Sequence, residues 1–439
     1  MEKAKPGWMA AGSGGAAARG GGFASGNRSG SRGGSGAAAG GGAKWAAYAA
    51  LASVPLVMVL GNSMIVPILP DLERQLGITA VQSSLVITLF SLAAGLVIPV
   101  VGYLSDRFTR KAVILPSLAV FGAAGLLAGF AVLWDNYPLL IASRALQGIG
   151  AAGTAPITMA LIGDMYRDGA ESEALGLIEA SNGTGKVLSP ILGTLLALIA
   201  WQAPFFVFPV FCALSLLAMA FLIREPKSGR SPALKVYIRH IREVFRSKGR
   251  WLIPAFLAGS TGLFNLFGVL FFLSDELEKP PLAVKGLAKG GVLAIPLLGL
   301  VVTSYATGRI IKNKGHLMRA LMNIGLMLQT ASFAAAVWLH GSMPLLVALL
   351  TASSIGTGLM LPCLNTLITG AVDRSHRGMI TSLYSSLRFL GVAFGPPAFG
   401  WLAGVSRGVL FGAVTGLAAA ALALVFFLVK PPELAGDVR

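Results

Sequence analysis

Four charged side chains stand inside long apolar stretches of the sequence: Arg144, Glu179, Lys186 and Arg388. An ionisable group in hydrocarbon costs from about 2.5 kcal/mol upward, so each of these residues needs a partner, a water-filled cavity or a function. A carboxylate beside such a cavity can gain and lose a proton when its surroundings alternate between wet and dry. We therefore predict that the four residues take part in transport across a membrane and that Glu179 couples it to protons.

One predicted helix carries three of the embedded polar groups on a single face. Glu179, Asn182 and Lys186 follow at i, i+3 and i+7, which is the spacing of neighbours on a helix surface. Counted from Glu173, Glu179 lies about 9 Å and Lys186 about 20 Å into the membrane. This depth indicates that Lys186 faces an internal cavity. Three alternatives stay open: Glu179 as an interfacial carboxylate paired with a loop arginine, Lys186 as a structural ion pair, and Arg144 as a residue reaching the outer surface.

Four asparagines also lie within apolar stretches, and we predict that they line the substrate cavity. They are Asn62, Asn182, Asn265 and Asn365. Each of them could equally form a hydrogen bond between helices. The chain offers no set of residues for catalysis, since its four histidines show no HExxH spacing and Cys212 and Cys363 lie in apolar runs without metal or redox spacing. We expect no enzyme activity, no metal and no cofactor.

The composition indicates that these residues belong to a membrane protein. Of 439 residues, 55% are apolar and 12% are charged, with a mean hydropathy of +0.75, whereas a soluble domain carries about 25% charged residues. This excludes ordinary soluble enzymes, disordered proteins and disulfide scaffolds. A helix that crosses a bilayer needs roughly 20 apolar residues. Twelve stretches reach this length: 45–69, 80–104, 112–134, 138–164, 174–199, 202–223, 250–274, 286–308, 316–338, 343–371, 379–402 and 406–430.

The formal charge of +17 sits in short loops, which is typical of membrane topology and argues against nucleic-acid binding. If both termini are cytoplasmic, the cytoplasmic segments hold 27 of the 35 Lys and Arg and the opposite loops hold five, so the positive-inside rule predicts that orientation. Residues 1–43 are rich in Gly, Ala and Ser, which predicts a flexible tail and no signal peptide. The basic segment 224–249 is either a solvated linker or an amphipathic helix on an anionic leaflet.

The sequence repeats itself at an offset of 206 residues. The matching pairs are Trp45 with Trp251, Gly102 with Gly308, Ile149 with Ile355, Gly150 with Gly356, Pro156 with Pro362, Gly185 with Gly391, and Pro190 with Pro396. Because glycine and proline mark close packing or bends in membrane helices, this gap-free match indicates a duplication. We predict an all-α membrane protein with twelve transmembrane helices in two pseudo-symmetric halves, as in secondary transporters. The predicted domains are a tail (1–43), a six-helix bundle (44–223), a linker (224–249), a second bundle (250–430) and a tail (431–439).

The loop after the second predicted helix carries the most specific pattern, formed by Gly102, Asp106, Arg107, Arg110 and Lys111. It resembles the G-x-x-x-D-R-x-x-R-K signature of the major facilitator superfamily. In that family the aspartate engages helix 11, here beginning near Met379, so the resemblance implies a conformational latch. A basic turn that merely obeys the positive-inside rule is the alternative. The equivalent segment 308–314 has no aspartate, and we expect a latch in the first half only.

Two further patterns resemble signatures of the same superfamily. Residues 144–152 are similar to R-x-x-Q-G-x-G-x-A, where the arginine is proposed to assist proton movement. Residues 185–193 and 391–397 resemble the antiporter signature G-x-x-x-G-P-x-x-G, with serine replacing the second glycine in the first copy. Such residues imply closely packed, bendable hinges. The predicted hinge and packing residues are Gly148, Gly185, Ser189, Pro190, Gly193, Gly391, Gly395 and Pro396.

The resemblance implies a monomeric secondary transporter in a bacterial cell membrane, similar to the drug:proton antiporters that export aromatic compounds. Its partners are then a small-molecule substrate, protons and the lipid bilayer. Many drug antiporters have an acidic residue in helix 1, but residues 45–69 contain none, which leaves Glu179 as the candidate proton site. Two alternatives stay open. Three embedded cations against one carboxylate favour an organic anion such as a catecholate siderophore, and a membrane sensor that transports nothing is the other.

Overall fold

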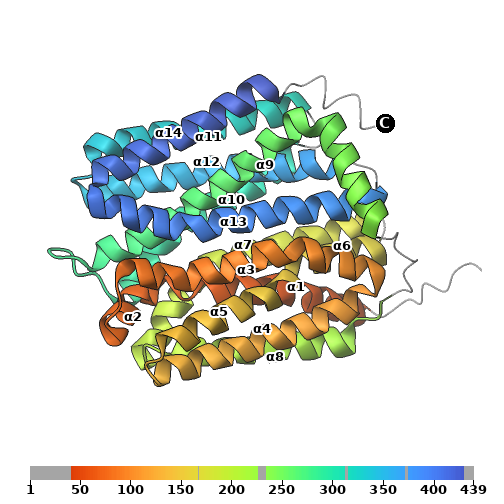
Figure 1. Ribbon diagram of the computed structural model, residues 1–439, viewed down its shortest axis with the longest axis horizontal. Coiled ribbons are helices and arrows are strands. Elements are labelled where there is room, and N and C mark those ends of the chain that lie inside the picture. Colours follow the sequence, from red (N-terminus) through yellow and green to blue (C-terminus); the bar gives the residue numbers. More distant parts are fainter. Residues whose placement is uncertain (1–40, 167, 226–233, 312–314, 371–373, 430–439) are drawn as a thin grey trace, which may run out of the picture.

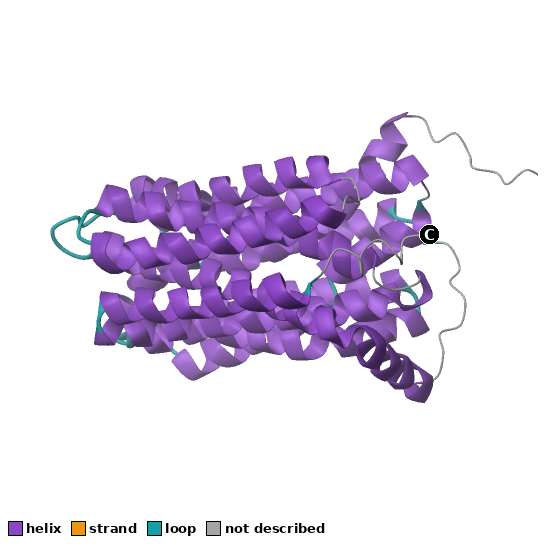
Figure 2. Cartoon of the chain, turned by 90° about the horizontal axis from the view of Figure 1, so that it is seen from above, coloured by secondary structure: helices purple, strands orange, loops and turns teal. Residues whose placement is uncertain are grey.

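The computed structural model describes residues 41–166, 168–225, 234–311, 315–370 and 374–429, without the side chains of Glu179 and of some residues near the breaks. This described part consists of helices joined by turns and loops, and no strand occurs in it (Figure 2). The helices run side by side along one direction, so their ends gather at two faces (Figure 1). The predicted tails, residues 1–43 and 431–439, lie outside the described residues apart from residues 41–43.

The first half begins with an apolar run that breaks once. α1 (Gly41–Ser63) leads through the short 3-10 helix η1 (Val66–Ile68) into α2 (Leu69–Leu76). Pro67 and Pro70 stand in the first turn of η1 and α2, where the missing N–H of proline leaves no intrahelical bond unmade. The other helices of this half are α3 (Ala80–Arg107), α4 (Arg110–Leu133), α5 (Tyr137–Ala152), α6 (Ala155–Met165), α7 (Asp168–Ile199) and α8 (Ala203–Leu222).

The fourth predicted span is also divided, into α5 and α6, at Gly153 and Thr154. The second half contains α9 (Leu234–Glu278), α10 (Gly286–Ile311), α11 (Gly315–Leu339), α12 (Met343–Gly370), α13 (Arg374–Val405) and α14 (Arg407–Leu428). Eleven helical segments of the described chain are long and apolar enough to cross a membrane. α13 has 32 residues and supplies the twelfth crossing, although it carries Arg388 and several serines. The predicted all-α fold with twelve crossings is confirmed.

Part of the predicted linker is helical. α9 is a continuous helix of 45 residues, so residues 234–249 are its first turns and precede its apolar part. Figure 1 shows this segment at the end of the bundle where α14 ends. We call this end, which also holds residues 107–110 and 223–225, the basic end. The far end is the opposite one, which holds α2 and residues 279–285.

The same set of helix pairings occurs in both halves. α1 packs on α7 and α8, as α9 packs on α13 and α14; α4 packs on α5 and α8, as α11 packs on α12 and α14. The pair α3 and α5 corresponds in the same way to α10 and α12. The halves meet where α3 packs on α13 and where α7 packs on α10. These two contacts are equivalent, because α3 of the first half corresponds to α10 of the second and α7 corresponds to α13. The duplicated sequence therefore folds into two similar bundles (Figure 1).

Equivalent glycines of the repeat mark equivalent helix crossings. A Cβ on Gly150 would overlap the α4 backbone at Phe121, and a Cβ on Gly356 would overlap the α11 backbone at Gly325. In both halves, the third and fourth crossings thus approach at a glycine that lets two backbones touch. The offset of 206 residues read from the sequence therefore corresponds to repeated packing in space.

Candidate functional site

Arg144 lies fully buried inside the first half. Its Nε donates a hydrogen bond to the carbonyl oxygen of Val86 in α3 at 2.9 Å, and its Nη1 donates to that of Gly61 in α1 at 3.1 Å. Its Nη2 donates to Oδ1 of Asn62 at 3.2 Å. The guanidinium also lies 4.6 Å from the centre of the Phe90 ring. Arg144 therefore ties α1, α3 and α5 together and is not at the outer surface, which was the alternative for this residue.

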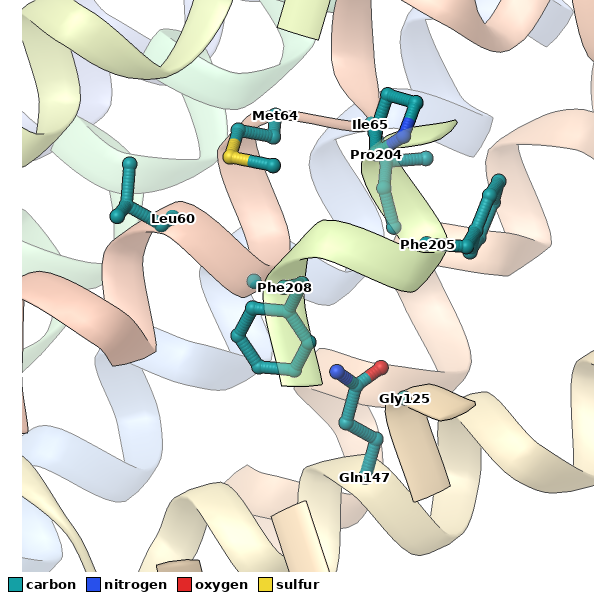
Figure 3. A pocket seen from close by; sticks show the side chains of 9 residues that line it. Leu60, Met64, Ile65, Gly125, Gln147, Pro204, Phe205 and Phe208 are labelled. Carbon is teal, nitrogen blue, oxygen red and sulfur yellow. The ribbon is translucent and has the colours of Figure 1, made fainter. Parts of the chain in front are cut away.

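A small cavity lies next to this arginine, beside Gln147 (Figure 3). Gln147 Oε1 accepts a hydrogen bond from Arg144, and the side chains of Phe208 and Leu60 line the same space. The volume of the cavity is about 10 Å³, which is room for about one water molecule. The surroundings of Arg144 can therefore admit water, but an organic substrate does not fit there.

Asn182 and Lys186 share the face of α7 that points into the protein. The neighbouring position Gly183 faces Val301 of α10, and Gly185 faces α1. Between these two contacts, by helix geometry, lie Asn182 and Lys186, and both side chains are half-buried. The opposite face of α7 is exposed at Leu188, Leu195 and Leu198, as expected for a surface that meets lipid. The side chain of Glu179 lies outside the described residues, so its predicted role stays a prediction.

Arg388 occupies the equivalent level of the second half, because the offset of 206 pairs it with Asn182. It is half-buried, and its Nη1 lies 3.5 Å from Oδ1 of Asn365 in α12. Its guanidinium lies 5.4 Å from the centre of the Tyr384 ring, and its Nε is buried without a hydrogen-bond partner among the described residues. On the other side of α13, Phe394 is exposed. In this region, each half thus contributes one half-buried cation and one half-buried asparagine.

Two of the four asparagines predicted to line a cavity join helices within one half. Asn62 is buried against Arg144. Asn265 of α9 is buried and donates through Nδ2 to Oε1 of Gln329 in α11 at 3.1 Å, and Gln329 donates to Thr357 of α12 at 2.5 Å. These are the interhelical hydrogen bonds that the sequence left open as an alternative. Of the predicted set, Asn182 and Asn365 are the half-buried residues.

The charged loop at the basic end is bound to its own half. Asp106 forms an ion pair with Arg110, and Nε of Arg110 lies 3.0 Å from Oδ2 of Asp164 at the end of α6. Nζ of Lys111 donates to the carbonyl oxygens of Ala220 and Ile223 at 2.6 and 2.7 Å, where a cation stabilises the end of α8.

Two further contacts complete this loop. The carboxylate of Glu225 accepts the backbone N–H groups of Arg110 and Lys111 at 2.6 and 2.8 Å, as expected at the N-terminus of α4. Arg107 Nη1 lies 3.4 Å from the Tyr103 hydroxyl.

Next to this loop, α3 contacts α13 at Gly102. A Cβ on Gly102 would overlap the side chain of Ser382, so the glycine allows α3 and α13 to approach closely. Further along the same pair, Ser386 Oγ donates to the carbonyl oxygen of Gly95 at 2.5 Å. The predicted partner of Asp106 falls at the start of α13, where the side chains of residues 374–377 lie outside the described residues. The latch itself therefore stays a prediction.

The predicted hinge residues lie at close helix contacts. A Cβ on each of four glycines would overlap a backbone carbonyl group of a neighbouring helix. The glycines and the residues whose carbonyls they meet are Gly148 with Phe90, Gly193 with Met64, Gly391 with Ser260, and Gly395 with Phe264. Pro190 and Pro396 are buried. Ser189 is also buried and donates to the carbonyl oxygen of Gly185 at 2.5 Å, so the serine that replaces the signature glycine makes its own polar contact.

An ion-pair cluster joins the two halves at the far end. Lys289, near the start of α10, is 1% exposed. Its Nζ lies 2.7 Å from Glu278 Oε1 and donates to the carbonyl oxygen of Pro67 at 2.5 Å. Glu278 Oε2 lies 2.5 Å from Nη1 of Arg74, which also pairs with Asp71. We call Arg74, Glu278, Lys289 and the Pro67 carbonyl the far-end seal, because its contacts run from η1 and α2 of the first half to α9 and α10 of the second.

A second set of contacts supports this end. Ser274 Oγ donates to the carbonyl oxygen of Val66 at 3.0 Å, again across the halves. Glu276 pairs with Arg407 and, at 2.8 Å, with Lys279. Burial opposes the charge of Lys279, but Asp275 and Glu276 hold the pKa of this lysine above its ordinary value.

Sequence reasoning missed the far-end seal. The five basic residues counted in the opposite loops include Lys289, although this lysine lies within the predicted span 286–308. A charge inside a predicted span is the signal that identifies it. Arg74 and Glu278 lie 204 residues apart, and no pattern in the sequence pairs them. Among the described residues, no group of His, Cys, Asp and Glu could hold a metal ion.

Comparison with known proteins identifies the family. The family model described as Major Facilitator Superfamily matches residues 51–331 and 286–438. A bacillibactin exporter of Bacillus subtilis (strain 168) is 45% identical over 386 residues, which cover 87% of this chain and 95% of the relative. The class C tetracycline resistance protein of Escherichia coli is 27% identical over 358 residues, covering 76% of this chain and 84% of that protein.

A solved structure shows the same fold at low sequence identity. The crystal structure of the human organic anion transporter MFSD10 (TETRAN) covers 87% of this chain and 99% of its own, with a TM-score of 0.70 and 20% identity. Likeness at this identity concerns the fold alone. The family match, the 45% identical relative and the two six-helix halves agree with the signature at Gly102–Lys111. The chain therefore belongs to the Major Facilitator Superfamily.

Proposed function

We propose that this transporter exports an aromatic organic anion of the catecholate siderophore class, driven by the proton gradient. The observation that carries the proposal is the placement of Lys186 with Asn182 and of Arg388 with Asn365, one pair from each half, toward the interior. Cationic groups and amides at this depth suit an anion that carries several hydroxyl and carbonyl groups. The 45% identity to a bacillibactin exporter supports the same substrate class.

Charge balance favours an anion over a cation. The sequence places Arg144, Lys186 and Arg388 well inside spans, and Glu179 is the one carboxylate at comparable depth. Arg144 is fully buried within the first half, whereas Lys186 and Arg388 are half-buried. By position, Lys186 and Arg388 are therefore the cations nearer the substrate path. An anion bound between them would contact both halves at once. Its binding would therefore depend on how the halves are arranged, which is the requirement for alternating access.

The far-end seal gives this proposal a direction. We propose that the basic end faces the cytoplasm, as the positive-inside rule predicts, and that both termini lie there. In the present arrangement, Arg74, Glu278 and Lys289 close the far end. Release of a substrate on that side requires these contacts to part. Protonation of Glu179 is the proposed event that lets the empty transporter return to the arrangement open at the basic end. The reason is that burying a neutral carboxyl group away from water costs less free energy than burying a charged one.

Uptake of iron-free bacillibactin into everted membrane vesicles tests the substrate class. With an imposed pH gradient, we expect uptake by the unaltered protein. Lys186→Gln and Arg388→Gln should each reduce it at least tenfold, the effect of losing a charge-assisted hydrogen bond worth about 1.5 kcal/mol. Arg309→Gln is the matched control, because Arg309 is exposed and stacks on Tyr305 outside this region. Absence of uptake by the unaltered protein would refute the proposal.

A second candidate function is efflux of amphipathic drugs. It is favoured by the 27% identity to the class C tetracycline resistance protein. The same vesicles distinguish the two functions with a cationic dye. If the protein exports drugs, the everted vesicles should take up the dye, and the Lys186→Gln variant should leave that uptake unchanged. A sensor that transports nothing should take up neither compound.

A further inference from the structure

An open groove lies at the basic end, between the α9 and α14 helices. Its volume is about 460 Å³, and its lining includes Phe245, Arg250, Ile253, Leu257, Leu424 and Leu428. Ile253, Leu257 and Leu424 are exposed, so the groove opens to the surroundings of the bundle. It is separate from the Lys186 and Arg388 region and from the far-end seal.

The face of α9 that lines this groove changes character along its length. Arg239, Arg242, Arg246 and Arg250 follow at steps of three and four residues, so they form one row on the helix. All four are exposed. The same row continues, at the same spacing, through Ile253 and Leu257. One helix face is therefore basic up to Arg250 and apolar beyond it.

This order matches one kind of ligand. The apolar part begins the stretch that crosses the membrane, so Arg250 stands at the level where a membrane meets water. An apolar groove that starts beneath a row of arginines complements a molecule with a hydrocarbon chain and an anionic head. The segment 234–250 has a single acidic residue, Glu243, so the row keeps a strong positive charge.

We propose that this groove binds an anionic phospholipid of the leaflet at the basic end. An acyl chain lies along Ile253, Leu257 and Leu424, and the phosphate group lies at Arg250 and Arg246. Basic groups at a membrane surface attract anionic lipids, and guanidinium groups bind phosphate oxygens through paired N–H donors. The lipid would thereby hold the first turns of α9, which join the two halves, to the membrane surface.

Native mass spectrometry of the whole protein tests this proposal. The protein is reconstituted in bilayers of equal phosphatidylglycerol and phosphatidylcholine, extracted in mild detergent, and analysed for retained lipid. We expect phosphatidylglycerol to be retained in preference to phosphatidylcholine. Arg250→Gln should reduce that preference about fivefold, the effect of one basic group at a membrane surface, and a further loss should follow when Arg246→Gln is added. Arg250→Lys should keep most of the preference.

Two further variants separate the groove from general charge. Arg309→Gln removes an exposed arginine at the same end of the bundle but outside the groove, and it should leave the preference unchanged. Leu424→Trp should fill the groove and lower retention of both lipids. Equal retention of the two lipids by the unaltered protein, or equal effects of Arg250→Gln and Arg309→Gln, would overturn the proposal.

Discussion

Nζ of Lys289 lies 2.7 Å from Oε1 of Glu278, and both side chains are buried at the point where the two halves of the transporter meet. The lysine also reaches the carbonyl oxygen of Pro67 in the first half, and the glutamate also reaches Arg74. Two charges taken out of water in this way depend on each other. Among the described residues, the lysine without Glu278 would keep only the Pro67 carbonyl oxygen, and the glutamate without Lys289 would keep only the more exposed Arg74. The far-end seal is therefore a unit that either forms completely or opens.

Removing one partner of this pair should open the far end. Lys289→Met leaves Glu278 buried with only the more exposed Arg74, and we expect a loss of stability of the closed arrangement on the order of 3 kcal/mol. Distances between spin labels on α2 and α10 should then lengthen. The double variant Lys289→Met with Glu278→Gln removes both charges. Its loss of stability of the closed arrangement should be smaller than the sum of the losses in the two single variants. Unchanged distances in Lys289→Met would show that the pair does not hold the halves together.

Arg144 should be required for the stability of the first half. Arg144→Ala deprives the carbonyl oxygens of Val86 and Gly61 and the side chain of Asn62 of their donor. We expect a loss on the order of 3 kcal/mol, seen as a lower midpoint of thermal unfolding in detergent. Arg144→Lys should recover only part of it, because an ammonium group cannot reach three separated acceptors as a guanidinium does. The exposed Arg309→Ala serves as the comparison.

Gly102 and Gly308 are equivalent in the repeat but should respond differently to substitution. A Cβ on Gly102 would overlap Ser382, whereas nothing lies within 4 Å of a Cβ on Gly308. Gly102→Ala should thus destabilise the protein by about 1–3 kcal/mol, the usual effect of overpacking. Gly308→Ala should be neutral or slightly stabilising, since alanine is the better helix former. Thermal unfolding of the two variants side by side measures the difference, and an equal response would contradict the close contact of α3 and α13.

Glu179 should couple transport to protons. In everted vesicles that hold an acidic interior, addition of substrate should release protons through the unaltered protein. Glu179→Gln should abolish this release while substrate still binds, because the amide cannot take up a proton at this position. Leu188→Ala, on the exposed face of the same helix, is the control and should leave proton release unchanged. Full substrate-dependent proton release by Glu179→Gln would remove Glu179 from the mechanism.

The membrane character, the spans and the duplication could all be predicted from the sequence. Apolar runs of about 20 residues are a property of composition and length, because the bilayer leaves the backbone no other regular form than the helix. The offset of 206 residues likewise needed only the chain itself, and Gly150 and Gly356 then prove to occupy equivalent crossings. The division of two spans, at Met64–Ile65 and at Gly153–Thr154, was not predicted, since these breaks interrupt hydrogen bonding without interrupting the apolar run.

The partners of the charged residues were decided by the tertiary structure alone. The sequence placed Arg144 among apolar residues, but the four acceptors around it come from α1, α3 and α5. Lys289 was counted among the loop charges, and the fold buries that lysine between Glu278 and a carbonyl group of the other half. Hydropathy and spacing describe one helix at a time, whereas a buried charge is satisfied by groups on other helices, and only the packing of the two halves brings those groups within hydrogen-bond distance.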